Sequence, residues 1–113
     1  MTLEIAGRTL ATDNEGYLLE PSDWTDDVAQ EIARREGLPL NDDRWVVVRF
    51  VREYFETRQS VPEARHALKD MQAKLGPDKG TRKYLYQLFP DGYGQHACKI
   101  AGVRKPLKLM LDI

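Results

Sequence analysis

The sequence predicts a small, mainly helical domain of the α+β class. We expect a helical bundle with a helix-turn-helix-like pair, preceded by an N-terminal β-hairpin and followed by a C-terminal arm. The chain has 113 residues, of which 42% are hydrophobic, enough for one domain with a single core. Apolar residues recur at helical spacing over most of its length. Alternation typical of strands occurs only near the N-terminus, and no clear period is seen in residues 103–113.

The β-hairpin is predicted from two short alternating segments. Apolar and polar residues alternate over residues 3–5 and again over residues 8–10, on either side of Ala6-Gly7. Glycine accepts the positive φ that tight hairpin turns require. The two segments should therefore pair as antiparallel strands.

Helices are predicted from apolar residues spaced three and four apart and from capping residues. Asn41 should cap the second helix, which we expect to be the central helix of the core. A capping box over 60–63 should open the third helix, with Pro62 in its first turn, and Thr81 should cap the fourth. The other bounds are about 24–36 for the first helix, 61–75 for the third, 81–89 for the fourth, and 95–101 for a short fifth helix that Gly102 ends.

We predict one domain, residues 1–102, followed by an arm of residues 103–113. No apolar stretch approaches the roughly 20 residues that a membrane-spanning helix needs. The N-terminus also lacks the basic and apolar pattern of a signal peptide. One cysteine excludes an internal disulfide. We therefore expect a reduced protein of the cytoplasm.

Charge is distributed unevenly along the chain. Residues 1–63 contain seven basic and fourteen acidic residues, whereas residues 64–113 contain ten basic and four acidic ones. A basic half attracts acidic partners, including nucleic acid and acidic protein surfaces. A solvated helical face explains the same pattern.

The third and fourth predicted helices have the spacing of a helix-turn-helix pair. Arg82 and Lys83 lie early in the second of these helices, where a recognition helix would meet DNA. They are therefore candidate nucleic-acid contacts. The alternative is that the pair serves packing alone, as most such pairs do.

Cys98 is the only cysteine and the main candidate for covalent chemistry. Lys99, Arg104 and Lys105 follow it closely, and nearby cations favour the reactive thiolate form. The alternative is a small apolar core residue, because free cysteines are often buried and inert. His96 lies two positions before the thiol, a helical spacing that points the two side chains apart. A Cys/His catalytic pair is therefore not expected.

Metal and cofactor sites are not predicted. One cysteine and two separated histidines do not form a credible metal site. His66 is expected to be a surface residue. No glycine-rich phosphate-binding loop is present.

Several long fragments, spread from about Leu3 to Lys108, form an ordered pattern. They comprise Thr12-Asp13 with 15–18, Trp45 with 48–52, Lys79-Gly80 with 84–90, and 97–102 with Lys105-Pro106. Together they resemble the DsrC/TusE family of sulfur-relay proteins, which includes the gamma subunit of dissimilatory sulfite reductase.

The resemblance implies a small helical domain with an N-terminal hairpin and a protruding C-terminal arm, as predicted above. It also implies a sulfur carrier or regulator rather than a stand-alone enzyme. Family members hold sulfur as a persulfide or trisulfide on arm cysteines. The implied partners are a sulfurtransferase complex of the DsrEFH or TusBCD type, sulfite reductase, or a tRNA-thiolation enzyme, with DNA as a lesser candidate and no membrane.

The chain departs from the family pattern in its cysteines. The family has a penultimate arm cysteine, which inserts into partner active sites, and a second one upstream. Cys98 matches the upstream position, whereas the penultimate residue is Asp112, and Leu109 stands where the other cysteine would be expected. A disulfide or trisulfide within one molecule needs two cysteines, so neither can form.

The resemblance thus predicts a sulfur-trafficking accessory protein. Cys98 would be its persulfide or mixed-disulfide site, and Lys99, Arg104 and Lys105 would bind the partner. The alternative is a regulatory or DNA- or protein-binding module without sulfur chemistry. One form of it would occupy the docking site of a two-cysteine relative and block it.

Overall fold

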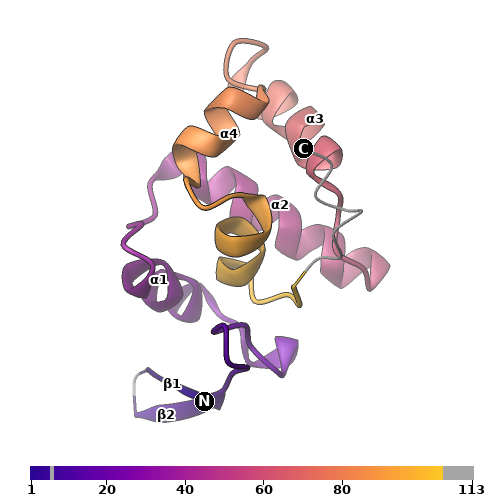
Figure 1. Cartoon of the computed structure of the whole chain (residues 1–113). Helices are drawn as coiled ribbons and strands as arrows, with labels where there is room; N and C mark the ends of the chain where they lie inside the picture. Colours follow the sequence, from indigo (N-terminus) through magenta and orange to yellow (C-terminus); the bar gives the residue numbers. More distant parts are fainter. Residues whose placement is uncertain (6, 106–113) are drawn as a thin grey trace.

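The computed structural model describes residues 1–5 and 7–105, and it confirms the predicted mainly helical fold with a small hairpin. Figure 1 shows the hairpin at one end of the molecule and the turn between α3 and α4 at the other. The elements in order are β1 (Thr2–Ile5), β2 (Arg8–Ala11), the 3₁₀ helix η1 (Pro21–Asp23), α1 (Asp26–Arg35), α2 (Asp42–Arg58), α3 (Ala64–Leu75), α4 (Arg82–Leu88) and the π-helix η2 (Tyr93–Cys98).

The hairpin forms as predicted. β1 and β2 pair antiparallel, with Leu3 opposite Leu10, and both of these leucines are buried. Side chains alternate across a strand, so the buried leucines place one face of the hairpin on the core. β1 packs against α1.

The first helix is shorter than predicted. α1 begins at Asp26 because Thr25 caps it: the Thr25 hydroxyl accepts a hydrogen bond from the Val28 backbone N–H. Trp24 lies before the cap in extended backbone, just after η1. Asp26 and Asp27, which follow this cap, lie in the first turn, where the helix dipole favours acidic side chains.

α2 is the central helix of the core, as predicted, and Asn41 caps it through the Arg44 N–H. Its buried face carries three valines and also Arg52, an arginine inside an apolar stripe. α2 packs against both α3 and η2. In Figure 1 it passes behind the gold segment that contains η2.

The predicted start of the third helix is wrong. α3 begins at Ala64, and Glu63 is its cap, with the His66 imidazole completing the capping box. Val61 and Pro62 are buried in the linker instead of lying in the first turn. His66, predicted to be a surface residue, is half-buried and stacks on the Tyr54 ring.

α4 begins after Thr81, as predicted, and the turn before it depends on Gly80. A side chain at Gly80 would place its Cβ only 2.7 Å from the backbone N and Cα of Gln72. The Gln72 side-chain amide also donates a hydrogen bond to the Gly80 carbonyl. The turn between α3 and α4 therefore closes directly onto α3.

The fifth helix differs from the prediction in type and start. Residues 93–98 form the π-helix η2, and ordinary helix continues to Ile100 before Gly102 ends it at φ 73°. Val103, which the prediction assigned to the arm, is fully buried, and its N–H bonds to the Cys98 carbonyl. Residues 106–113, most of the predicted arm, lie outside the described residues. Within the described part, no helix is long and apolar enough to cross a membrane.

Replacing Gly80 with alanine should destabilise the protein by about 1–3 kcal/mol, because the new Cβ forces the turn away from α3. Chemical denaturation monitored by circular dichroism measures this loss. Asp78→Ala, at an exposed position of the same turn, is the matched control and should stay within about 0.5 kcal/mol of the wild type. Equal stability of both variants would contradict the close contact.

Candidate functional site

The Cys98 thiol lies in the interior of the domain. Its exposed fraction is 0%, and it belongs to the main hydrophobic core. Burial raises the pKa of this thiol to about 12, and the influence of Tyr93 only partly opposes the shift. The prediction that nearby cations favour the thiolate is therefore wrong for this conformation. Desolvation of the charged form outweighs any attraction to cations.

Two tyrosines hold η2 in place. The Tyr17 hydroxyl, from the loop after the hairpin, donates a 2.8 Å hydrogen bond to the Gly94 carbonyl. The Tyr93 hydroxyl donates a 2.6 Å hydrogen bond to the Pro62 carbonyl in the linker before α3. Both bonds are buried, and burial raises the pKa of each tyrosine. Because they join segments far apart in sequence, they fix η2 to two sides of the core.

A tryptophan and an arginine fix the residues that follow Cys98. The Trp24 indole N–H donates a 2.8 Å hydrogen bond to the Ile100 carbonyl. The Arg52 guanidinium lies 4.8 Å from the Trp24 ring and donates to the carbonyls of Ala101 and Pro21. A Cβ on Gly102 would lie 2.3 Å from the Trp24 ring. Trp24 and Arg52 therefore hold the backbone of the residues just after Cys98.

The three basic residues predicted to bind partners are in different environments. Lys99 is buried, with its ammonium 3.4 Å from Glu36 and 5.3 Å from the Tyr17 ring centre. It cannot meet a partner in this conformation, which corrects the prediction for that residue. Arg104 and Lys105 are exposed, and Lys105 forms an ion pair with Glu15 at 3.0 Å.

His96 lies on the same π-helix as Cys98 and is surrounded by other titratable groups. The imidazole is 3% exposed, and its Nδ1 accepts a 3.2 Å hydrogen bond from the Asp91 N–H. Its Nε2 has no hydrogen-bond partner, although it lies 3.2 Å from the Asp91 carboxylate and 3.7 Å from that of Glu36. Burial lowers the pKa of His96, against the attraction of these two acids.

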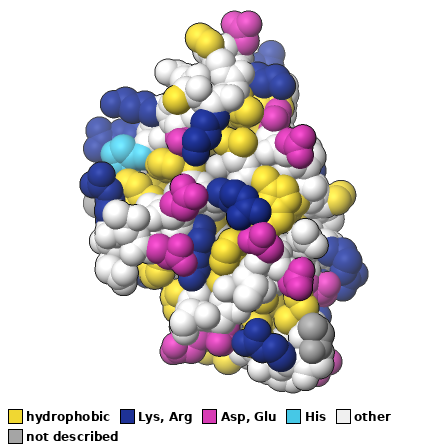
Figure 2. All heavy atoms as spheres, turned by 180° about the vertical axis from the view of Figure 1, so that it is seen from behind, with side chains coloured by type: hydrophobic (Ala, Val, Ile, Leu, Met, Phe, Trp, Pro, Cys, Tyr) yellow, Lys and Arg dark blue, Asp and Glu magenta, His cyan; other side chains and the backbone are white. Residues whose placement is uncertain are grey.

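The candidate nucleic-acid contacts Arg82 and Lys83 are both exposed on α4. On the face drawn in Figure 2, acidic and basic side chains are interspersed, with hydrophobic side chains between them. A broad single-sign field, which favours nucleic acid, is not seen on this face.

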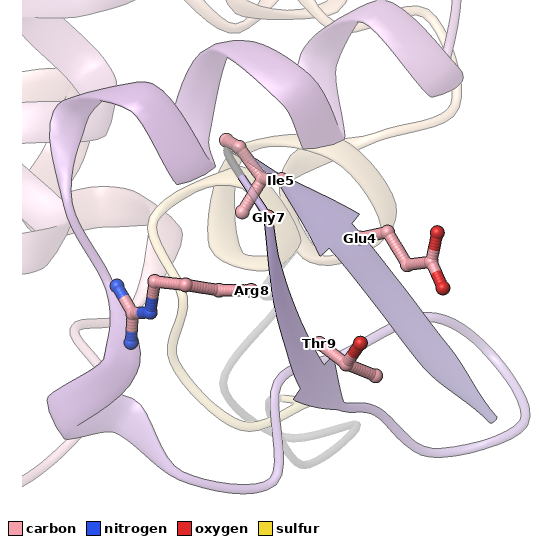
Figure 3. A pocket seen from close by; sticks show the side chains of 5 residues that line it. All are labelled: Glu4, Ile5, Gly7, Arg8 and Thr9. Carbon is pink, nitrogen blue, oxygen red and sulfur yellow. The ribbon is translucent and has the colours of Figure 1, made fainter.

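Cys98 does not line either of two pockets found among the described residues. One of about 290 Å³ is lined by hairpin residues alone, and Figure 3 shows Glu4 and Arg8 pointing to opposite sides of it. A smaller hollow of about 110 Å³ is lined in part by Gly16, Glu36 and Lys99. Among the described residues, no group of three or more potential metal ligands comes together.

Comparison with known proteins identifies the family. The sequence matches the family described as DsrC like protein over residues 4–110. This chain belongs to that family. It is similar to the sulfurtransferase TusE of Pectobacterium atrosepticum, with 44% identity over 94% of this chain and 97% of the relative. The sulfurtransferase TusE of Escherichia coli is 45% identical over 90% of this chain and 94% of the relative.

Solved structures of DsrC proteins share the fold. The oxidized gamma subunit of the dissimilatory sulfite reductase of Archaeoglobus fulgidus superimposes with a TM-score of 0.86 at 32% identity, covering 95% of this chain and 97% of that one. DsrC of Allochromatium vinosum gives a TM-score of 0.84 at 43% identity, covering 94% and 95%. The resemblance inferred from sequence fragments is therefore confirmed.

The residues that hold η2 were missed by sequence reasoning. One signal was available for Arg52, which lies four residues after Val48 and so falls on the buried stripe of α2. A charged residue on such a stripe usually binds a buried polar group. Nothing in the sequence indicates which carbonyl it meets, because Ala101 is 49 residues away.

The buried thiol should react with a small disulfide reagent at least about 100-fold more slowly in the native protein than in the unfolded chain, because the reagent reaches it only through local opening. Stopped-flow absorbance with and without denaturant gives both rates. Similar rates would show that Cys98 is accessible, contrary to the structure.

Stability should fall above about pH 9, where the unfolded thiol ionises while the folded thiol stays protonated up to about pH 12. The folded state then binds more protons than the unfolded state, so raising the pH favours unfolding. Relative to Cys98→Ala, which lacks the titrating group, the wild type should lose about 1.4 kcal/mol by pH 10. Urea denaturation of both proteins at pH 8 and pH 10 measures this loss. If the difference in unfolding free energy between the two proteins is the same at both pH values, the raised pKa is contradicted.

Proposed function

We propose that this protein is a sulfur-relay accessory protein that carries sulfur on Cys98, and that it does so only when η2 opens. The observation that carries the proposal is the similarity to sulfurtransferase TusE and to DsrC over nearly the whole chain, combined with the presence of a single cysteine. The comparisons give no support to a nucleic-acid role for Arg82 and Lys83. A protected, reduced thiol fits the reducing cytoplasm.

The chemistry needs one bond exchange and no external oxidant. The Cys98 thiolate attacks the outer sulfur of a cysteine persulfide on a donor protein. A sulfur–sulfur bond forms on Cys98 while the donor's sulfur–sulfur bond breaks, and the donor cysteine leaves as a thiolate. The proton lost by Cys98 is taken up by the leaving thiolate through solvent, so the products are a Cys98 persulfide and a donor thiol.

The closed structure prevents this reaction, because the thiol is covered and held protonated. The π-helix supports an opening at this place. A π-helix is uncommon, and single turns of it are frequently found at functional sites. Side chains from elsewhere in the chain help to hold this region closed: Tyr17 binds Gly94 of η2, and Trp24 and Arg52 bind the residues that follow it. Docking of a partner can therefore release the thiol by displacing side chains.

A second candidate function is docking without sulfur chemistry. It is favoured by the complete burial of Cys98 and by the two exposed cations after it, Arg104 and Lys105. In that case the protein would occupy the binding site of a two-cysteine relative on a shared partner. Both candidates predict partner binding, and they differ in whether sulfur reaches Cys98.

Sulfur transfer is tested by incubating the protein with a persulfide-loaded sulfurtransferase complex of the TusBCD or DsrEFH type. Intact-mass spectrometry should show the wild type gaining the mass of one sulfur atom, whereas Cys98→Ser gains none. Digestion should place the added sulfur on Cys98. If the two proteins bind and the wild type stays unmodified, the carrier function is wrong and the docking function stands.

Docking is tested with the double variant Arg104→Ala/Lys105→Ala and the same complex. Loss of two rim charges should slow association and weaken binding by about tenfold at low salt, with a smaller effect at high salt. Arg65→Ala/Lys69→Ala removes the same charge from exposed positions of α3 and is the control. Surface plasmon resonance at two salt concentrations gives the rates. Equal loss in both variants would point to net charge rather than to this site.

A further inference from the structure

His96 is a buried titratable group that the sulfur transfer described above does not use. It lies on η2, two residues before Cys98. Its Nδ1 accepts the Asp91 N–H, and the nitrogen that accepts a hydrogen bond carries no proton of its own. The neutral imidazole therefore carries its proton on Nε2. This tautomer is built into the junction between α4 and η2.

Protonation of His96 would disrupt this junction. An added proton goes to Nδ1, where it would face the Asp91 N–H, so that two donors would oppose each other at 3.2 Å. The backbone of Asp91 must then move away from the ring. The His96 N–H is itself bonded to the Gly92 carbonyl, which forms the start of η2. A shift at residues 91 and 92 is therefore transmitted directly to the first turn of the π-helix.

Charged groups from four segments of the chain lie near the imidazole. Asp91 and Glu36 would favour an imidazolium, while Lys99 and Arg44 would oppose it. Two acids against two bases nearly offset one another, so the loss of hydration decides which form is favoured. The closed structure consequently favours neutral His96. The Asp91 carboxylate is 72% exposed, which gives solvent protons a route to the site.

We propose that His96 is a proton-controlled latch: protonation releases the junction at Asp91, opens η2 and exposes Cys98 to a sulfur donor. The inference rests on the sulfur-carrier function proposed above and adds its regulation. Neutral His96 keeps the thiol closed, and charged His96 favours the open form. Sulfur loading is therefore promoted in mildly acidic surroundings, such as a protein surface rich in carboxylates.

The direction follows from proton linkage. The pKa of His96 is lower in the closed form of η2 than in the open form. In the open form it approaches the ordinary value of 6.5. Below that pH the open form binds more protons, so acidification favours opening. The opening constant should rise by up to about tenfold per pH unit below about pH 6.5. Above pH 7 it should be independent of pH.

The test measures how fast 4,4′-dithiodipyridine, which reacts in mild acid, modifies Cys98 between pH 5.5 and 7.5. At each pH the rate measured in urea is divided by the rate of the native protein to give a protection factor. This ratio removes the intrinsic pH dependence of the thiol. The resulting protection factor should fall on acidification in the wild type. In His96→Gln it should stay constant, because the glutamine carbonyl can accept the Asp91 N–H and does not titrate in this range.

His66→Gln is the matched control. His66 also accepts a backbone N–H through Nδ1, from Glu63, but it lies on α3 and is half-buried. This variant should keep the pH dependence of the wild type. A protection factor that does not change with pH in the wild type, or one that changes equally in His96→Gln, overturns the proposal.

If His96→Gln does not fold, amide hydrogen exchange of residues 93–98 in the wild type replaces it. After correction for intrinsic exchange, opening should increase below pH 6.5 in these residues and not in the middle of α3. Uniform change across the protein would overturn the latch. Neither measurement involves a sulfur donor, so failure of the latch and failure of the carrier function are separate outcomes.

Discussion

The structure depends on the burial of residues 93–103 against α2. This segment includes Cys98, Ile100 and Val103, all with an exposed fraction of 0%. Along the chain it is the last described segment that contributes to the core. Figure 1 shows it in gold at the middle of the molecule, next to α2. Removing it would take away one of the two helical segments against which α2 packs, the other being α3. The C-terminal end of the domain is therefore as much part of the core as its central helix.

Burying this segment requires partners for its backbone carbonyls, because an unpaired buried carbonyl is costly. Backbone N–H groups near the end of the segment bind some of these carbonyls. Side chains from three other segments of the chain bind further ones: Tyr17 binds Gly94, Trp24 binds Ile100 and Arg52 binds Ala101. Arg52 also stacks near two aromatic rings, which screens its charge within the core. The bonds that satisfy the backbone thus also fix Cys98 in position.

The same arrangement explains how a thiol can be present and yet protected. Burial keeps Cys98 protonated and covered, so a single exposed cysteine is not left to oxidise or to cross-link copies of the chain. The contacts that hold the segment closed include side-chain hydrogen bonds from Tyr17, Trp24 and Arg52 and the hydrogen bond between Asp91 and His96. Storage and release of the thiol can therefore depend on the same few contacts.

The sequence predicted the elements whose signals are local. The hairpin, the Asn41 and Thr81 caps and the central position of α2 follow from residues that contact their own neighbours in sequence. The predicted starts of two helices were wrong: Thr25 caps α1, so Trp24 lies outside it, and Glu63 rather than Ser60 caps α3. The family was also recognisable from sequence fragments, because a long ordered pattern is distinctive without coordinates.

By itself, the sequence determined the fold class, the family and the position of the one cysteine. The tertiary structure alone decided that this sulfur is closed. The prediction treated Lys99, Arg104 and Lys105 as neighbours of the thiol because they are near in sequence. In the folded chain Lys99 turns to Glu36, and the sulfur faces the core. Whether a thiol ionises depends on water and on charges within a few ångströms, and those distances are set by segments such as residues 17, 24 and 52 that the sequence places far away.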